Sequence, residues 1–308
     1  MPRVTEEGPF ARQRLLATVA AACRHAGLDP TEAHLIHITV NAIFLLPRDR
    51  LVLRITAASD PAAQARHVTQ IARWLASQDV PAVRLAPVSQ PLLVEESRHA
   101  VTYWRYLPQE GPPLGAGDLG QPLRRLHALP LPPFPLPAWR PLHVARARIA
   151  RHAAHVLTAE EHRWFTQRAD DLQSELDHVD FPLARAVIHG DAYIGNLLRD
   201  ESGGPVLCDL DSMCLGPVEW DLIPELVGHR RYHRPATEYQ RLVDEYGFDP
   251  RTWQGHRVLC ELREYLVLTS VLPVLDSSAG IADEFRLRLD AMRRGDTAAI
   301  WTPFGRAA

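Results

Sequence analysis

Lysine is absent from the 308-residue sequence, so all 34 basic side chains are arginines. No lysine can act here as a nucleophile, form a Schiff base or clamp a phosphate, and any cationic phosphate contact must come from a planar guanidinium group. The formal net charge is only -3. The chain therefore lacks the excess of one sign that binding to nucleic acid or to a charged membrane surface would predict.

Cysteines are few, and long apolar runs are missing. The four cysteines show no C-x-x-C spacing, which argues against a disulfide framework or a zinc site and favours a reducing cytoplasm. No stretch approaches the roughly 20 apolar residues of a membrane span, and residues 1–7 carry early acids without an apolar run, which predicts no secretory signal. We therefore expect a cytoplasmic protein that binds neither membranes nor nucleic acid.

The first third of the chain is predicted to be a small sheet with one long inserted helix. Helices are predicted over 11–26, stopped by Gly27, and over 61–77, opened by Pro61. The β-branched and apolar segments predict strands over 35–46, 51–56, 92–95 and 100–107. Beyond this part, helical patterns predominate to about residue 294, interrupted by a proline-rich run at 131–137 and a short β region at 186–211.

The segment 187–198 carries the residues that indicate a chemistry. It reads V-I-H-G-D-A-Y-I-G-N-L-L, with Asp191 and Asn196 five residues apart, which is the spacing of the kinase catalytic loop. Phosphoryl transfer needs a carboxylate that accepts a hydrogen bond from the attacking hydroxyl, and an amide oxygen can hold Mg²⁺ without adding charge. The alternative is a buried structural aspartate followed by an asparagine in a turn.

A hairpin is predicted to follow this segment, because D-E-S-G-G-P at 200–205 is a strong turn sequence. If Arg199 pairs with Val206, the same register places Asn196 opposite Asp209, with Cβ atoms about 4.5 to 5.5 Å apart. One amide and one carboxylate would then converge on a single metal ion. The inference depends on the register, because a slip of one residue turns each side chain to the other face.

These motifs resemble the aminoglycoside phosphotransferase family, the small-molecule branch of the protein-kinase-like fold. The sequence has H-G-D-x-x-x-x-N at 189–196, an apolar segment with D-x-D at 206–211, and G-P-x-x-W-D-L at 216–222. Segments at 73–83 and 103–107 extend the resemblance over most of the chain. It implies a bilobal α+β protein-kinase-like fold with a β-rich nucleotide-binding lobe at 1–105, a hinge at 106–110 and a mainly helical catalytic and acceptor-binding lobe at 111–308.

The resemblance also implies roles for five acidic or amide side chains. Asp191 would be the catalytic base, and Asn196 and Asp209 would hold Mg²⁺. Asp211 would be a further ligand or a supporting group, and Asp221 would brace the catalytic loop through hydrogen bonds.

The nucleotide lobe departs from the family pattern in two ways. The segment in place of a glycine-rich phosphate loop, 37–42, contains no glycine, and Arg54 replaces the strand lysine. The predicted helix at 61–77 has no acid to pair with that arginine, so the usual ion pair is missing or replaced. Arg54 lies within an apolar run, which favours a phosphate contact over a solvent-facing position. We expect the nucleotide contacts to come from Asn41, Arg54, Tyr106 and Leu107, the last two at the hinge.

The predicted function is the Mg²⁺-dependent transfer of the γ-phosphate of ATP or GTP to a hydroxyl of a small molecule, such as an antibiotic in a resistance enzyme or a related metabolite. An aminoglycoside, a macrolide, a nucleoside antibiotic, a sugar and an amino alcohol all remain open as acceptors; a polycationic aminoglycoside would require an acidic cleft. The alternative is a non-catalytic, pseudokinase-like nucleotide-binding module. Glu261, Glu264 and Tyr265 either line the acceptor pocket or are surface charges and a core aromatic.

Overall fold

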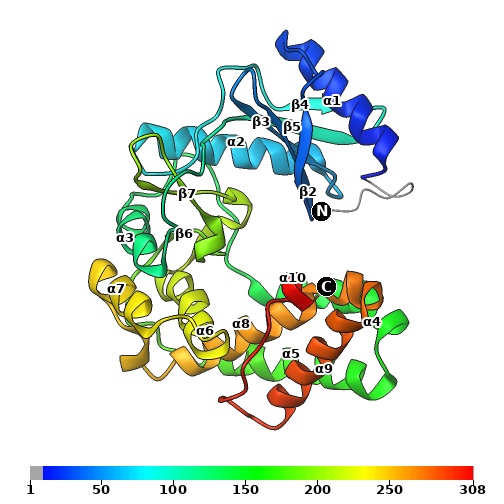
Figure 1. Cartoon of the computed structure of the whole chain (residues 1–308). Helices are drawn as coiled ribbons and strands as arrows, with labels where there is room; N and C mark the ends of the chain where they lie inside the picture. The colour runs from blue at the N-terminus through cyan, green and yellow to red at the C-terminus, as the bar shows by residue number, and fades with distance from the viewer. Residues whose placement is uncertain (1–9, 308) are drawn as a thin grey trace. The chain divides into compact units, whose positions relative to one another are not determined.

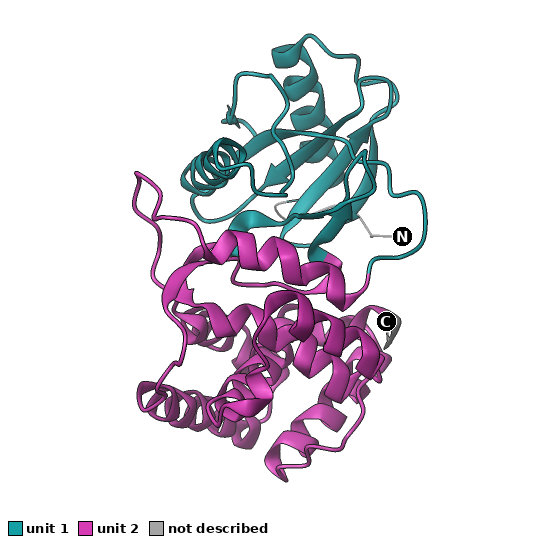
Figure 2. Cartoon of the chain, turned by 90° about the vertical axis from the view of Figure 1, so that its left-hand side faces the viewer, with its two compact units in different colours: residues 1–114, 196–212 teal, residues 115–195, 213–308 magenta. Residues whose placement is uncertain are grey.

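The structure is a computed structural model that describes residues 10–307. Residues 1–9, on which the expectation about a secretory signal rests, lie outside that range. The chain divides into two compact units, coloured in Figure 2. The first comprises residues 1–114 and 196–212, and the second comprises residues 115–195 and 213–308. The first unit therefore takes in a segment from the middle of the chain.

The first unit is built on an antiparallel sheet with the strand order β1-β2-β3-β5-β4. The strands are β1 (His34–Ile38), β2 (Asn41–Leu46), β3 (Leu51–Thr56), β4 (Leu92–Val94) and β5 (His99–Arg105). The strand predicted over 35–46 is in fact two strands, because the chain reverses at 39–40, where the Thr39 N–H donates to the Asn41 carbonyl at 3.0 Å.

Two helices of the first unit begin and end close to where the sequence predicts. Helix α1 (Arg12–Ala26) stops at Gly27, whose left-handed conformation (φ 70°) suits a residue without Cβ. Helix α2 (Pro61–Ser77) begins after Asp60, whose side chain accepts the Ala63 N–H at 2.9 Å. Its apolar face packs against β3 and β5 (Figure 1).

The segment 196–212 adds a short hairpin to this unit, formed by β7 (Leu197–Arg199) and β8 (Pro205–Leu207). Leu207 joins it to the segment before β4, since its N–H donates to the Pro81 carbonyl and its carbonyl accepts the Val83 N–H, both at 2.9 Å. The 3₁₀ turn η3 (Leu210–Ser212) follows and contacts α2.

The predicted register of this hairpin is wrong by one residue. Arg199 pairs with Pro205 rather than with Val206, and Asn196 opposes Cys208, whose N–H donates to the Asn196 carbonyl at 2.9 Å. The turn closes through the Asp200 N–H, which donates to the Gly204 carbonyl at 2.8 Å. This register leaves Pro205, which has no N–H to donate, at a pairing position that needs none.

The second unit is mainly helical around one small antiparallel pair. Strand β6 (Arg185–Ile188) pairs with β9 (Cys214–Pro217). The helices are α3 (Gly120–His127), α4 (Pro141–Val156), α5 (Ala159–Asp177), α6 (Ile223–Arg231), α7 (Ala236–Tyr246), α8 (His256–Ser270), α9 (Ala279–Arg293) and α10 (Phe304–Ala307). Their apolar faces share one core, whose largest buried side chains include Trp220, Phe165, Tyr265 and Phe285.

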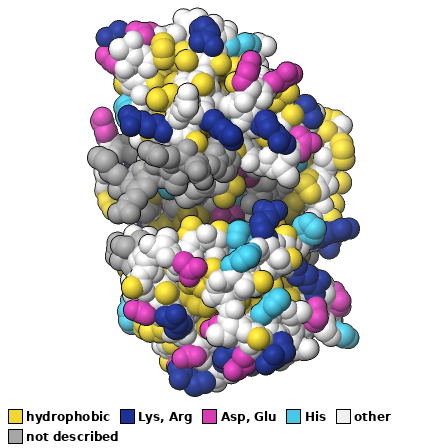
Figure 3. Space-filling model, turned by 90° about the vertical axis from the view of Figure 1, so that its right-hand side faces the viewer, with side chains coloured by type: hydrophobic (Ala, Val, Ile, Leu, Met, Phe, Trp, Pro, Cys, Tyr) yellow, Lys and Arg dark blue, Asp and Glu magenta, His cyan; other side chains and the backbone are white. Residues whose placement is uncertain are grey.

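Two properties bear on the expectation that the protein binds neither membranes nor nucleic acid. Within residues 10–307, no helix has both the length and the apolar character needed to cross a membrane. On the face shown in Figure 3, basic and acidic side chains are interspersed rather than separated by sign.

Candidate active site

The backbone that leads to Asp191 is anchored by a buried carboxylate. Strand β6 ends at Ile188, and the chain then turns at Gly190, whose φ of 84° favours glycine. The fully buried Asp221 accepts the His189 N–H at 2.6 Å and the Gly190 N–H at 2.8 Å. This is the bracing role that the resemblance implies for Asp221. His127 contacts the same carboxylate through Nε2 at 3.0 Å.

Two further contacts hold the loop on either side of Asp191. The Trp220 indole N–H donates to the Gly190 carbonyl at 2.8 Å. The buried Glu225 accepts the Ile194 N–H at 2.8 Å and is itself paired with Arg234 at 2.6 Å. The loop is therefore fixed at both ends by side chains of the following 3₁₀ turn η4 (Val218–Leu222) and of α6.

Asp191 lies beside two arginines. Its side chain is 33% exposed and accepts a hydrogen bond from Arg263 Nη1 at 2.7 Å. Arg148 on α4 is half-buried: burial lowers the pKa of its guanidinium, and the negative charge of Asp191 opposes that shift. A carboxylate that is accessible, charge-paired and mounted on a rigid loop can accept a hydrogen bond from a hydroxyl compound.

The other predicted residues of the metal and phosphate site lie in the first unit, where Asn41, Arg54 and Asp211 form a largely buried polar network and Asp209 stays half exposed. Arg54 on β3 pairs with Asp211, and its Nη2 lies 3.8 Å from Asp209 Oδ1. Asn41 Nδ2 donates to Asp211 Oδ2 at 3.2 Å, and Thr56 donates to Asn41 Oδ1 at 2.9 Å. Burial lowers the pKa of Arg54, and the charge of Asp209 opposes that shift.

Asp211 therefore takes the place of the missing helix acid. The sequence left open whether the usual ion pair was absent or replaced, and here the partner comes from the D-x-D segment instead of α2. Among the described residues, Arg54 Nη1 and Asp211 Oδ1 are buried without a hydrogen-bond partner. Such unpaired buried atoms are costly unless a ligand satisfies them.

The residues present fit a hard divalent cation. Asn196, Asp209 and Asp211 offer only oxygen ligands, which Mg²⁺ prefers. The Asp209 carboxylate is 49% exposed, and one oxygen of Asp211 has no partner within residues 10–307. Asp209 also adopts a left-handed backbone conformation (φ 57°), so the strand alternation used to predict its orientation ends there. No cluster of three or more His, Cys, Asp or Glu side chains suited to a metal occurs in the described part of the chain.

Tyr106 and Leu107, which were expected at the hinge, already make backbone hydrogen bonds within the first unit. The Tyr106 N–H donates to the Arg50 carbonyl at 2.9 Å, and the Leu107 carbonyl accepts from Gln109 at 2.9 Å. The Tyr106 N–H is therefore already used, whereas the Leu107 carbonyl, which has two lone pairs, can accept a second hydrogen bond.

Helix α8 carries Glu261, Glu264 and Tyr265, which were expected either to line the acceptor pocket or to be surface charges and a core aromatic. Neither alternative describes all three residues. Glu264 is buried in an ion pair with Arg231, Tyr265 is a core aromatic, and Glu261 pairs with Arg168. Arg263, between them, is the residue that contacts Asp191. Sequence reasoning missed Arg263 and Arg148, because one arginine among 34 basic residues carries no local signal.

Several solved structures of small-molecule kinases are similar to this chain in fold. An amicoumacin kinase is similar with a TM-score of 0.70 at 11% identity, over 97% of this chain and 98% of that chain. A choline/ethanolamine kinase family protein from Mesorhizobium loti is similar with a TM-score of 0.61 at 19% sequence identity, over 95% of this chain and 97% of that chain. An aminoglycoside phosphotransferase from Streptomyces rimosus is similar with a TM-score of 0.55 at 19% sequence identity, over 82% of this chain and 97% of that chain. At such low identity these likenesses establish the protein-kinase-like α+β fold, as predicted.

The sequence itself assigns the family. The model of the phosphotransferase enzyme family matches residues 41–259, well over half of the chain. The chain therefore belongs to that family, which confirms the resemblance to aminoglycoside phosphotransferases and makes it a small-molecule phosphotransferase. No curated protein sequence matches that of this chain.

Proposed function

We propose that the protein transfers the γ-phosphoryl group of ATP or GTP to a hydroxyl of a small molecule, with Asp191 as the base. The observation that supports this most directly is the clamp of Asp221 on the His189 and Gly190 amides, which presents an accessible carboxylate on a rigid loop. Rigid positioning of this kind supplies much of the rate enhancement in phosphoryl transfer, since little covalent chemistry falls to the protein.

In the proposed reaction, Asp191 accepts a hydrogen bond and then the proton from the acceptor hydroxyl. The hydroxyl oxygen forms a bond to the γ-phosphorus as the bond to the bridging oxygen breaks, and the nucleoside diphosphate leaves. Asn196 and Asp209 would hold Mg²⁺, with Asp211 as a further ligand. The metal ion would neutralise charge on the phosphates.

The donor is proposed to bind the first unit. Arg54 and Asn41 would contact the phosphates, and Tyr106 and Leu107 would meet the purine. The unpaired Arg54 Nη1 supports a phosphate contact, although Arg54 must share its charge with Asp211. Structures of similar proteins support a nucleotide and a divalent cation: the amicoumacin kinase was solved with AMP-PNP, Ca²⁺ and Ami, and an aminoglycoside 2'-phosphotransferase with GDP.

A product assay over a library of hydroxyl compounds tests the proposal. We expect Asp191→Ala to lower turnover by roughly 10² to 10⁴-fold, the usual contribution of a general base, while thermal shifts with nucleotide stay unchanged. The matched control is Asp283→Ala, which removes a 79% exposed carboxylate on α9. Near-normal turnover of Asp191→Ala would show that the base lies elsewhere. Nucleotide binding by the wild type without transfer to any acceptor would favour the non-catalytic alternative.

A further inference from the structure

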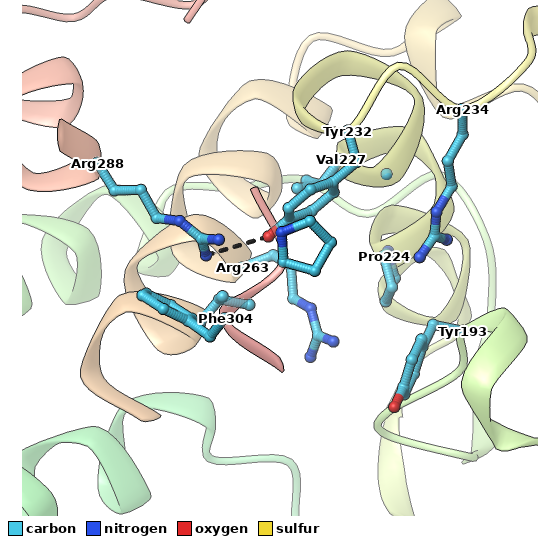
Figure 4. Close-up of a pocket in the computed structure, with 11 residues that line it drawn as sticks. Tyr193, Pro224, Val227, Tyr232, Arg234, Arg263, Arg288 and Phe304 are labelled. Carbon is cyan, nitrogen blue, oxygen red and sulfur yellow. Dashed lines mark hydrogen bonds between the residues drawn. The ribbon is translucent and has the colours of Figure 1, made fainter. Parts of the chain in front are cut away.

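A cavity of about 220 Å³ lies in the second unit, and Asp191 is not one of the residues that line it. It is joined to Asp191 through Arg263, which lines the cavity and donates to that carboxylate, and through Tyr193, two residues further along the loop. Figure 4 shows the side chains of Arg263 and Arg234 extending toward the space bounded by Tyr193 and Phe304.

The cavity offers hydrogen-bond donors and no carboxylate. Within residues 10–307, its lining contains three arginines and two tyrosines but no acidic side chain. Arg234 and Arg288 are paired with Glu225 and Glu284, which do not line the cavity. Both carboxylates also accept backbone hydrogen bonds, Glu225 from the Ile194 N–H and Glu284 from the Thr302 N–H at 2.9 Å. A ligand therefore meets guanidinium and hydroxyl groups, which suit an acceptor of hydrogen bonds.

The local charge is positive when Arg148 is included. Arg234, Arg263 and Arg288 each pair with one carboxylate, namely Glu225, Asp191 and Glu284. Arg148 adds a fourth guanidinium that interacts with Asp191. Four guanidinium groups against three carboxylates leave one positive charge uncompensated.

One wall of the cavity is already rigid. Arg288 is fully buried, its guanidinium lies 3.8 Å from the centre of the Phe304 ring, and it donates to the Tyr232 hydroxyl at 3.1 Å and to the Thr302 carbonyl. A wall held in this way loses little freedom when a ligand binds, which favours affinity.

We propose that the acceptor is a small hydroxyl compound that bears a carboxylate or a phosphate, seated against Arg263 and Arg234 with its hydroxyl toward Asp191. This inference rests on the proposed function and narrows its substrate class. The volume is below the roughly 300 to 1,000 Å³ of sites for drug-sized ligands. A polycationic aminoglycoside would meet like charge in this cavity.

Equilibrium binding of matched probes tests the inference without requiring turnover. Glycerate and glycerol 3-phosphate carry the two anionic groups, glyceramide and glycerol are their neutral counterparts, and kanamycin is the polycation. We expect at least one anionic probe to bind at least tenfold more tightly than its neutral counterpart. The tighter-binding of the two anionic probes shows whether the site prefers a carboxylate or a phosphate. Equal binding of anionic and neutral probes, or tighter binding of kanamycin, overturns the inference.

Substitution of Arg263 locates the site. We expect Arg263→Met to weaken binding of the anionic probe at least tenfold and Arg263→Lys to be intermediate, since an ammonium lacks the planar fork. Arg148→Gln, which acts through charge alone, should weaken binding less. The matched control is Arg286→Gln on α9, whose side chain is 67% exposed. Weakened nucleotide binding in Arg263→Met, with unchanged binding of the anionic probe, would mean that Arg263 serves the donor phosphates and would overturn the inference.

The two proposals fail in different ways. If anionic probes bind through Arg263 but no acceptor is ever phosphorylated, the proposed function is wrong and the anion site stands. If phosphoryl transfer depends on Asp191 but proceeds only to neutral or cationic acceptors, the proposed function stands and the anionic acceptor is wrong.

Discussion

Removal of the Asp221 carboxylate should destabilise the second unit and slow catalysis together. Asp221 is fully buried and accepts two backbone N–H groups in addition to its contact with His127. Hydrogen bonds to a charged group are worth about 1.5 to 3 kcal/mol each, and buried donors left unpaired add a further cost. Because such contacts are not additive, we expect Asp221→Ala to lower the free energy of unfolding by about 3 to 5 kcal/mol, as for a broken buried ion pair.

The catalytic effect follows from the position of the two amides. They belong to His189 and Gly190, directly before Asp191, so their release would let the proposed base drift. A misplacement of about 1 Å can cost roughly 100-fold in rate. We therefore expect kcat to fall by about that factor, with the nucleotide KM little changed, because Arg54 and Asn41 belong to the other unit.

Urea unfolding and steady-state kinetics on three variants check this reasoning. Asp221→Asn keeps one acceptor oxygen and loses the charge, so its losses should be smaller than those of Asp221→Ala. Asp283→Ala serves as the surface control. If Asp221→Ala unfolds within about 0.5 kcal/mol of the wild type, the range of an ordinary surface substitution, the loop does not depend on this carboxylate.

Three further predictions concern the first unit and the cysteines. Arg54→Ala should raise the nucleotide KM strongly while the acceptor KM changes little, and Arg54→Lys should be only partly active; wild-type nucleotide kinetics would place the phosphate contact elsewhere. Asn196→Ala and Asp209→Ala should weaken nucleotide binding in Mg²⁺ much more than in its absence, and equal losses in both titrations would exclude them as ligands. Burial raises the pKa of Cys214 and Cys260 from 9.0 to about 12. Because the folded pKa lies above the unfolded one, their contribution to stability should be complete below pH 9 and fall toward pH 12 in urea unfolding; rapid alkylation of Cys214 or Cys260 themselves in native protein at pH 8, located by peptide mapping, would contradict their burial.

The helices of the first unit and the family were predictable because their signals are local. The Asp60 cap and Pro61 define the start of α2, and Gly27 defines the end of α1. The motif around Asp191 combines spacing and composition within 12 residues, so its resemblance to the family could be recognised without knowledge of the fold. The family match over residues 41–259 confirms the resemblance drawn from these motifs.

The hairpin register was missed because it depends on details of the turn. The turn sequence predicted the hairpin, but both registers place apolar side chains together. The choice is made by the Asp200 side chain, which accepts the Ser202 and Gly204 amides at 2.8 Å, and by a left-handed Gly203 (φ 89°). These contacts close the turn one residue earlier than expected.

The partners of Arg54 and of Asp191 lay beyond sequence reasoning for a different reason. Asp211 is 157 residues from Arg54, and Arg263 is 72 residues from Asp191. Pairs of this kind are set by tertiary packing, and no periodicity reports them. The missing acid on the helix at 61–77 was the only available hint that Arg54 had found another partner.

Because residues 196–212 are synthesised long after the sheet that they complete, the first unit cannot be completed until the ribosome has made about two thirds of the chain. Leu207 supplies two backbone hydrogen bonds to the segment 81–83, and Asp211 supplies the partner of the buried Arg54. Both arrive about a hundred residues after the sheet that needs them, which at roughly 5 to 20 residues per second takes about 5 to 20 s. During that interval Arg54 lacks the counter-charge that Asp211 provides in the complete structure. We expect fragments that end before residue 212 to be protease-sensitive, and their separate expression as a domain to fail.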